Sequence, residues 1–425
     1  MAGEPMVTGV DIGTYLTKVV VLKQQRDDIP PSVIALGTSF TEGMRKGVVI
    51  DEEDVAQSIT RAVQEAQDML DETIEEAYVS FGGSHISAHT RREKIAVSRA
   101  DGEVSPDDVQ RLKEHVSRHK SSMNKNILDV KEKSYMLDDT SDIHDPVGMH
   151  GIRLELEGLL IEGDESALKT HQNALEKSGL SVAEKHVSVF ATAEAVLTKK
   201  QRELGVVLVD IGASTTSLVV YEERTVIHLA VIPIGASHIT NDLAIGLKTS
   251  IEIAERVKIK YGYVSPDHIP SSATNRIQLS EFNQEETASF PIEFVAEVIE
   301  ARVQEIFQFV NQELAGVERE GLLPAGAVLT GGGANIRDIV PLAKSELDLP
   351  AQVGQPTKLE GNLAEVQDPL FATCVGLAQY GMLHEGRAPG NGGPSWWENV
   401  LSPLTGLMGG SGKRLKGWFD NIFPE

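Results

Sequence analysis

Two segments of the chain share one pattern, in which an apolar strand ends in Asp-Ile-Gly and a second apolar strand follows. The first segment, from Val7 to Leu22, is VTGVDIGTYLTKVVVL, and the second, from Gly205 to Tyr221, is GVVLVDIGASTTSLVVY. Runs of Val, Ile and Leu around a glycine-containing turn are typical of buried strands, so each segment predicts a β-hairpin. Because the pattern occurs twice, we expect an α/β protein with two similarly built halves.

A third strand and glycine turn are predicted in AVLTGGGANIRDI, from Ala327 to Ile339, with a helix starting near Asn335. Glycine turns let backbone N–H groups converge on an anion, because glycine permits close approach and positive φ. Asp11 and Asp210 end the two hairpin strands and are suited to hold Mg²⁺ through water, together with phosphates. Lys18, on the returning strand, lies within reach of those phosphates. The three turns therefore predict a nucleotide site.

Charge and cysteine content narrow the class of protein. The chain has 425 residues, with 39 Lys and Arg against 63 Asp and Glu, and a net charge of −24. Such a charge repels nucleic acid, so we expect no nucleic-acid partner. Cys374 is the single cysteine, which excludes an intrachain disulfide and favours a reducing compartment. Without a leader-like segment or about 18 consecutive apolar residues, the chain is expected to be neither exported nor membrane-spanning.

The segments between the glycine turns predict the domain organisation. Residues 82–161 read as strands and a polar helix. Residues 241–320 place apolar residues at helical spacing. A stretch rich in Gly and Pro, GRAPGNGGPS, marks a flexible linker near the C-terminus. The predicted parts are a first domain (1–81 and 162–204) with an inserted subdomain (82–161), a second domain (205–240 and 321–384, including a return helix) with an inserted helical lobe (241–320), a linker (385–410) and a tail (411–425).

The tail, GKRLKGWFDNIFPE, predicts an amphipathic helix. Its apolar residues recur at helical spacing and its cations cluster at the start, which suits a helix lying in a membrane interface that contains anionic lipid. An alternative is that the stripe docks on the protein's own body. Upstream, Trp396 to Met408 is a second apolar stretch, either an auxiliary contact or plain linker. The predicted membrane residues are Lys413, Arg414, Leu415, Lys416, Trp418, Phe419, Ile422 and Phe423.

These motifs, in this order, resemble those of the actin-like ATPase superfamily: two phosphate hairpins, an adenosine turn and two connecting helices. Four further segments resemble the FtsA family of bacterial cell-division proteins, and the inserted subdomain sits where that family carries its own. The superfamily motifs are Asp11–Lys18, Ala191–Leu197, Asp210–Thr216, Thr330–Ile336 and Pro369–Gly381; the FtsA-like segments are GMRKGVVID (43–51), VSFGGSHI (79–86), DPVGMHGIRLE (145–155) and LTKKQRELGVVLVDIG (197–212).

The resemblance implies an actin-like two-domain fold with duplicated mixed-sheet cores, an FtsA-type insert and a C-terminal amphipathic helix. It also implies binding of ATP and Mg²⁺, polymerisation with other copies, and tethering of FtsZ to the cytoplasmic face of the membrane at the division site, among other divisome proteins. The implied cofactor-binding residues are Asp11, Gly13, Thr14, Tyr15, Lys18, Asp210, Gly212, Ala213, Ser214, Thr215, Gly235, Glu252, Glu255, Lys258, Gly331, Gly332, Gly333 and Ile336.

One part of this set has a simpler explanation. Glu252, Glu255 and Lys258 are spaced at three and six residues, so they also fit a plain solvated helix face. Their match to the family's nucleotide-contacting helix favours the functional interpretation.

The sequence departs from the superfamily pattern in two places. The second hairpin reads DIGASTTS, so Ala213, Ser214 and Ser217 stand where a glycine-rich DIGGGTTD would ease phosphate approach and supply an acid. The group that orients the attacking water has two candidates, Glu194 and Ser188. Because phosphoryl transfer depends on positioning and electrostatics, we expect ATP binding with slow or negligible hydrolysis. Two alternatives stay open: a pilus-assembly actin-like adaptor and a small-molecule kinase of the same superfamily.

Overall fold

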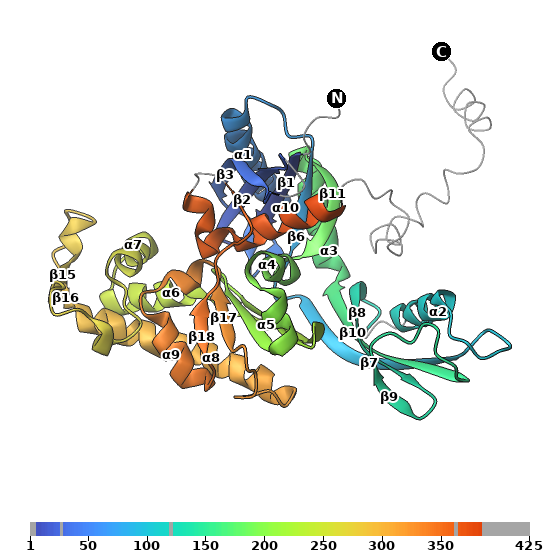
Figure 1. Ribbon diagram of the computed structural model, residues 1–425. Helices are drawn as coiled ribbons and strands as arrows, with labels where there is room; N and C mark the ends of the chain where they lie inside the picture. The colour runs from blue at the N-terminus through green and yellow to red at the C-terminus, as the bar shows by residue number, and fades with distance from the viewer. Residues whose placement is uncertain (1–5, 26–28, 119–121, 361–363, 385–425) are drawn as a thin grey trace, which may run out of the picture.

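The computed structural model describes residues 6–25, 29–118, 122–360 and 364–384. Its centre is a pair of five-stranded mixed sheets, ordered β11-β6-β1-β2-β3 and β14-β13-β12-β17-β18 (Figure 1). The first contains β1 (Met6–Ile12), β2 (Leu16–Lys23), β3 (Ser32–Phe40), β6 (Glu76–Phe81) and β11 (Ser181–Val187). The second contains β12 (Val206–Ile211), β13 (Thr216–Glu222), β14 (Thr225–Ile232), β17 (Ala327–Thr330) and β18 (Ala351–Val353).

The two sheets have the same topology. β1 pairs antiparallel with β2 and parallel with β6, and β12 pairs antiparallel with β13 and parallel with β17. The register sets Asp11 opposite Lys18 in the first hairpin and Asp210 opposite Ser217 in the second. The expectation of two similarly built α/β halves is therefore confirmed, and each half presents an Asp beside a tight turn.

Helices pack between and around the sheets. Figure 1 shows α4 and α10 in the centre of the molecule, where both contact strands. Asp51 caps α1 by accepting hydrogen bonds from the N–H groups of Glu53 and Asp54, which satisfies donors that a helix start leaves free. The helices around the two sheets are α1 (Glu52–Leu70), α3 (Glu165–Ser178), α4 (Ser188–Val196), α5 (Lys199–Leu204), α9 (Ile339–Leu347), α10 (Ala372–His384), η3 (Gly332–Asn335), η4 (Ala364–Gln367) and η5 (Pro369–Phe371). A short hairpin is formed by β4 (Met44–Arg45) and β5 (Val48–Val49).

The helix expected from near Asn335 begins later, at Ile339. Gly332 to Asn335 instead form a 3₁₀ turn, and Asp338 adopts a left-handed φ of 62° immediately before α9. A residue in that conformation cannot continue a right-handed helix, so the glycine turn and α9 are separate elements.

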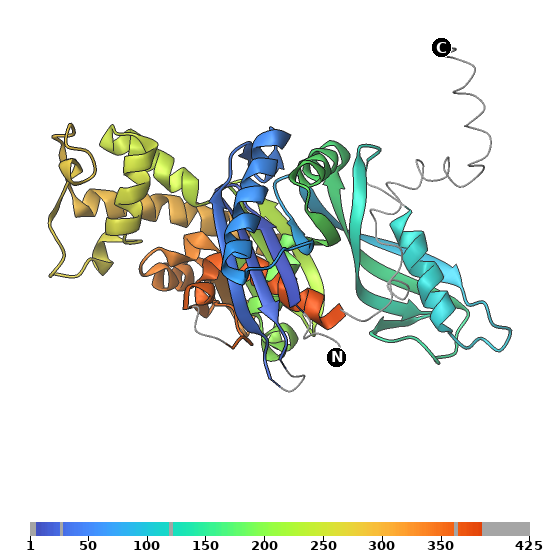
Figure 2. The same cartoon turned by 90° about the horizontal axis from the view of Figure 1, so that it is seen from above.

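Two smaller units project from opposite sides of the body, as Figure 2 shows. The unit after β6 is a four-stranded sheet, β7-β10-β8-β9, with α2 against one face and the edge strand β14 of the second domain against the other. Its core contains Leu112 and Val116 of α2 and Leu154 and Leu156 of β10. Its elements are β7 (Ile86–Ala96), α2 (Pro106–Ser117), β8 (Lys125–Leu137), β9 (Thr140–Ile143) and β10 (Arg153–Asp164).

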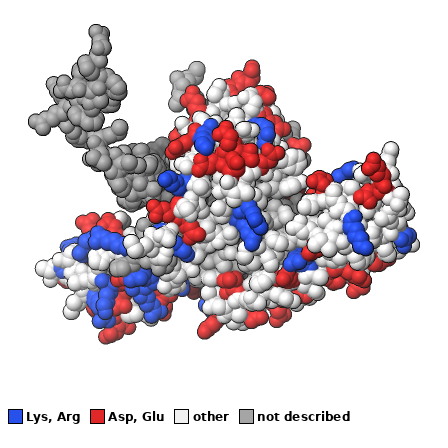
Figure 3. Space-filling view, turned by 180° about the vertical axis from the view of Figure 1, so that it is seen from behind, with Lys and Arg blue, Asp and Glu red and all other residues white. Residues whose placement is uncertain are grey.

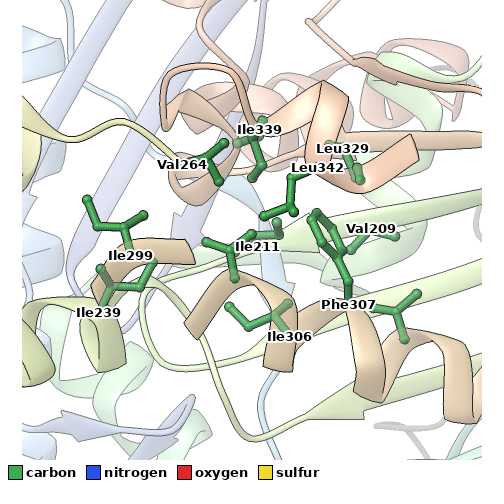
Figure 4. Close-up of a cluster of buried hydrophobic side chains, with 14 of the residues drawn as sticks. Val209, Ile211, Ile239, Val264, Ile299, Ile306, Phe307, Leu329, Ile339 and Leu342 are labelled. Carbon is green, nitrogen blue, oxygen red and sulfur yellow. The ribbon is translucent and has the colours of Figure 1, made fainter. Parts of the chain in front are cut away.

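The other unit is mostly helical and shares its core with the second sheet. Figure 4 shows Ile306 and Phe307 of α8 beside Val209 and Ile211 of β12. Burying side chains of this size contributes about 1.5–3 kcal/mol each, so α8 is held firmly against the sheet. The elements are α6 (Ala236–Leu247), α7 (Ile251–Tyr261), η1 (Pro266–His268), β15 (Arg276–Gln278), η2 (Leu279–Glu281), β16 (Ser289–Pro291) and α8 (Ile292–Gly316).

The surface is charged and uneven. Figure 3 shows acidic side chains gathered over the end of the molecule where Figure 1 places α1, whose first turn holds Glu52, Glu53 and Asp54. Across the described ranges, no helix combines the length and the apolar character that crossing a bilayer requires. The predicted linker, the Trp396 to Met408 stretch and the predicted amphipathic tail lie outside the described residues.

The crossing of α4 and α10 depends on a glycine. A Cβ atom on Gly376 would lie 1.8 Å from the carbonyl oxygen of Ala191, so Gly376→Ala must push the two helices apart. We expect the free energy of unfolding in urea to fall by about 1–3 kcal/mol, as overpacking does. The matched control is Gly316→Ala at the end of α8, where a Cβ meets nothing within 4 Å. The free energy of unfolding of Gly316→Ala should equal that of wild type or exceed it by up to about 1 kcal/mol. Equal losses of stability in both variants would contradict the prediction.

Candidate nucleotide-binding site

A cavity of about 480 Å³ opens between the two domains, within the range typical of small-molecule sites. Both hairpin turns, the third glycine turn and α7 contribute to its wall. The structure thus brings together most of the residues predicted for nucleotide binding. Those that line the cavity are Asp11, Gly13, Thr14, Tyr15, Lys18, Asp210, Gly212, Ala213, Thr215, Glu255, Lys258, Gly331, Gly332, Gly333 and Ile336.

A buried ion pair lies at the base of the first hairpin. The ammonium of Lys18 is 2.7 Å from the carboxylate of Asp11, and both side chains are only 9% exposed. Ser80, at the end of β6, donates its hydroxyl to Asp11 at 2.7 Å and accepts the N–H of Ile12 at 3.0 Å. Burial, the largest single effect, would lower the pKa of Lys18, but the Asp11 carboxylate together with Cys374 and Asp210 raises it further, so the pKa is raised overall and Lys18 stays charged.

Asp210 occupies the equivalent place in the second hairpin without a lysine of its own. Burial first, and the nearby Asp11 charge second, raise the pKa of Asp210 to about 6. Thr192 of α4 donates to the Asp210 carboxylate at 3.1 Å, and its hydroxyl also lies 2.9 Å from that of Thr373 in α10. Two carboxylates and one ammonium therefore share the cavity floor, an arrangement that favours binding of a further cation.

The third glycine turn passes directly over Asp210. Gly331 has a φ of 79°, and a Cβ atom there would lie 2.3 Å from the Asp210 carboxylate. Both the conformation and the close approach require glycine.

Lys258 and Glu255 of α7 form a polar network in the cavity wall. The ammonium of Lys258 donates to Glu255 at 2.6 Å and to the hydroxyl of Thr240 at 2.8 Å. Burial lowers the pKa of Lys258, while Glu255 opposes that effect. Arg337, which sequence reasoning missed, also lines the cavity and stacks over the ring of Tyr263 at 5.1 Å.

Three residues predicted for the site do not line the cavity. Ser214 bonds to Thr14, and Gly235 caps α6 with its backbone so close to Gly212 that a Cβ would lie 2.5 Å from the Gly212 carbonyl oxygen. Glu252 is exposed in the first turn of α7, where Ser250 hydrogen-bonds to it and lowers its pKa. It lies one helical turn before Glu255, and only the later turn reaches the cavity.

Of the two candidates for orienting water, the structure places Ser188 in the cavity wall and Glu194 outside it. The carboxylate of Glu194 pairs with Arg202 at 2.9 Å and lies 3.9 Å from Lys358. The physical reason is the helical period of α4, which turns Ser188 and Thr192 toward the cavity side and Glu194 toward α5. Glu194 therefore supplies no carboxylate to the cavity.

Several cavity residues carried no chemical signal in the sequence. Gly47, Gly82 and Gly83 come from two of the FtsA-like segments, and the N–H of Gly47 donates to the hydroxyl of Thr14 at 3.0 Å. Ser80 and Thr373 are isolated hydroxyl residues within apolar stretches, a pattern with no recognisable spacing. The predicted membrane residues from Lys413 to Phe423 lie outside the described residues.

Solved structures share this architecture. The PilM–PilN type IV pilus biogenesis complex aligns with a TM-score of 0.62 and 18% identity over 88% of this chain and 98% of that one. MreB5 of Spiroplasma citri bound to ADP aligns with a TM-score of 0.52 and 13% identity over 89% and 96%. Two matching mixed sheets, joined by helices around a glycine-lined cavity, define an actin-like fold.

Sequence comparison narrows the class. The family profile described as cell division protein FtsA matches residues 207–376, and the SHS2 domain inserted in FtsA matches residues 83–162. FtsA of Pseudomonas aeruginosa is 34% identical over 89% of both chains, and FtsA of Neisseria meningitidis is 32% identical over 98% of both. The chain belongs to the FtsA family of bacterial cell-division proteins.

The raised pKa of Asp210 makes a prediction for stability. An acid whose pKa rises from 3.8 to about 6 on folding binds more protons when folded, so stability falls as pH rises through this window. Asp210→Asn removes the buried charge. We expect this variant to exceed wild type by about 3 kcal/mol in unfolding free energy near pH 7.5, and by less than about 1 kcal/mol near pH 4.

The measurement is urea unfolding of nucleotide-free protein at both pH values. The control is Asp139→Asn, an exposed carboxylate in the insert, which should change nothing at either pH. An Asp210→Asn advantage that is the same at both pH values would contradict the electrostatic explanation.

Proposed function

We propose that this protein binds ATP with Mg²⁺ in the interdomain cavity, polymerises on the cytoplasmic face of the membrane, and tethers FtsZ filaments there through its C-terminal tail. The observation that carries the nucleotide part is the convergence of three glycine turns from two domains on one cavity with Lys18, Asp11 and Asp210 at its floor. Such turns bind phosphate, and a single lysine suits a phosphate oxygen.

The residues present fit Mg²⁺ in the way this cation is usually held. Asp11 and Asp210 are close enough to raise the pKa of Asp210, so a bound cation relieves their repulsion. Within the described ranges, no group of three or more His, Cys, Asp or Glu residues forms a ready metal cage. Mg²⁺ is ordinarily bound by one or two carboxylates with phosphates and waters, so two carboxylates suffice. The ion would neutralise phosphate charge.

The adenosine end of the ligand fits between α7 and the third glycine turn. Lys258 and Glu255 offer a donor and an acceptor there, and Gly262, Gly332 and Ile336 leave an open apolar wall. MreB5 of Spiroplasma citri, which shares the fold, has been crystallised with ADP and with AMPPNP. This supports an adenine nucleotide as the ligand of the cavity.

Slow hydrolysis follows from the acids that the cavity contains. Among the described lining residues these are Asp11, Asp210 and Glu255. Asp11 is bound to Lys18 and Ser80, and Glu255 to Lys258, so neither is a free base. Asp210 is assigned to Mg²⁺. Ser188 carries a short hydroxyl, whereas a longer carboxylate or amide side chain orients the nucleophile in well-characterised phosphoryl-transfer sites.

The family assignment favours the FtsZ-tethering role over the two alternatives. A pilus-assembly adaptor would share the fold, but the PilM–PilN likeness at 18% identity shows the fold alone. A small-molecule kinase would need a catalytic base for its acceptor, but two of the carboxylates that line the described cavity, Asp11 and Glu255, are paired with lysines, and the third, Asp210, is assigned to Mg²⁺.

Nucleotide binding is tested by a charge at the tip of the second hairpin. Ala213→Asp places a carboxylate beside the expected triphosphate, and we expect ATP affinity, measured by calorimetry with Mg²⁺, to fall at least about tenfold. Ala213→Asn is the same size without the charge, so the ratio between the two variants measures the electrostatic effect. Equal ATP affinities of the two variants, or no ATP binding by wild type, would contradict the proposed ATP site. Brisk phosphate release by wild type would overturn slow turnover alone.

Membrane tethering is tested by co-sedimentation with anionic liposomes. The full chain is expected to pellet with lipid and to bring purified FtsZ down with it, whereas a chain truncated after Met408 leaves both in the supernatant. ATP should increase the pelleted fraction, because polymerisation adds avidity to a weak single anchor. If the truncated chain pellets as well, the tail is not the anchor.

A further inference from the structure

The two hairpin turns touch each other directly. Ser214, in the turn between β12 and β13, donates its hydroxyl to the hydroxyl oxygen of Thr14, in the turn between β1 and β2, at 2.8 Å. We call this hydrogen bond the hairpin latch. Because the two residues belong to different domains, the latch connects the domains across the interdomain cavity.

Thr14 is fixed on the side of the first domain. Its hydroxyl oxygen also accepts the N–H of Gly47 at 3.0 Å, so both of its lone pairs are used. Gly47 packs so closely on Gly83 that a Cβ atom would lie 2.3 Å from the Gly83 Cα, and the neighbouring Lys46 carbonyl accepts the N–H of Ser84 at 3.0 Å. Ser214 therefore bonds to a rigid partner.

The latch lies where the expected phosphates enter. Gly13 and Tyr15 flank Thr14 and line the cavity, and Ala213 and Thr215 do the same around Ser214. Ser214 itself does not line the cavity while it is bonded to Thr14, but both of its neighbours do, so an anion that approaches the N–H groups of the two turns comes close to the Ser214 hydroxyl. A phosphate oxygen is a stronger acceptor than a neutral hydroxyl, so it can displace Thr14 as the partner of Ser214.

We propose that Ser214 is a positioning residue that holds the cleft closed in the nucleotide-free protein through the hairpin latch, and that it transfers its hydrogen bond to a triphosphate when one binds. This inference rests on the proposed ATP site. The latch lowers the fraction of protein that can accept nucleotide, which slows association. After transfer, the same hydroxyl holds the phosphate and slows dissociation. Ser214 thus slows both the association and the dissociation of nucleotide, and the affinity for nucleotide stays nearly constant.

The test is the kinetics of a fluorescent ATP analogue with Mg²⁺ on the full chain, measured by stopped flow. One neutral hydrogen bond shifts an equilibrium by up to about tenfold. We therefore expect Ser214→Ala to raise the association and dissociation rates each by about three- to tenfold, with affinity changing less than either rate. Thr14→Val, which removes the acceptor, should raise the association rate similarly, and Thr14→Ser should return it to the wild-type range.

The double variant identifies the latch as the cause. If Ser214 and Thr14 act through one hydrogen bond, Ser214→Ala with Thr14→Val associates no faster than either single variant. Additive effects, or an unchanged association rate in both single variants, overturn the proposal. The proposal also fails if Ser214→Ala lowers the affinity only by raising the dissociation rate, with the association rate unchanged. Ser214 would then contact only the bound phosphate.

Amide hydrogen exchange of the nucleotide-free chain tests the latch without ATP. Ser214→Ala and Thr14→Val should both speed exchange in peptides covering residues 13–16 and 212–216, while β8 in the insert stays at wild-type rates. If wild type binds no ATP, the proposed function fails, and this experiment alone decides whether the latch holds the cleft closed. Unchanged exchange in both variants shows that it does not.

Discussion

The arrangement of the two domains depends on three charged side chains that are buried between them. Asp11, Lys18 and Asp210 meet at the floor of the cavity, and only Asp11 and Lys18 neutralise each other. Removing one member of such a pair leaves an uncompensated buried charge, which costs about 3–5 kcal/mol. In the described part of the chain, Asp210 is supported by a hydroxyl hydrogen bond from Thr192. Two carboxylates and one ammonium leave the cavity floor with a net negative charge, and this is the electrostatic basis for proposing Mg²⁺ there.

The surrounding architecture holds these groups at fixed positions. α10 lies against β1 so closely that a Cβ on Gly9 would lie 2.1 Å from the Cys374 carbonyl oxygen, and it crosses α4 at Gly376. These two helices contact each other, and between them they contact strands of both sheets, so they join the two domains beside the cavity. Close contact of this kind makes interfaces switch between discrete arrangements rather than deform continuously. The hairpin latch would then select between two such arrangements.

Much of the fold could be predicted because its signals are local. The paired Asp-Ile-Gly hairpins and the third glycine turn each follow from strand composition and turn chemistry within a short segment, and the structure confirms the duplicated sheets. The connecting helices were predicted from the family resemblance. The start of α9 was predicted too early, since Asn335 belongs to a 3₁₀ turn that the left-handed Asp338 separates from the helix. Boundaries of this kind depend on backbone conformation, which the side-chain pattern specifies only weakly.

The sequence by itself determined the two hairpins, the residues at their turns and the family, because these rest on local spacing and on similarity along the chain. Only the tertiary structure decided which side chains share the cavity. It brought Ser80 to Asp11 and Thr373 to Thr192, turned Glu194 toward Arg202, and joined Ser214 to Thr14 across the two domains. Apart from the Glu194–Arg202 pair, these contacts link residues far apart in sequence through the packing of helices on the two sheets, so no spacing along the chain encodes them.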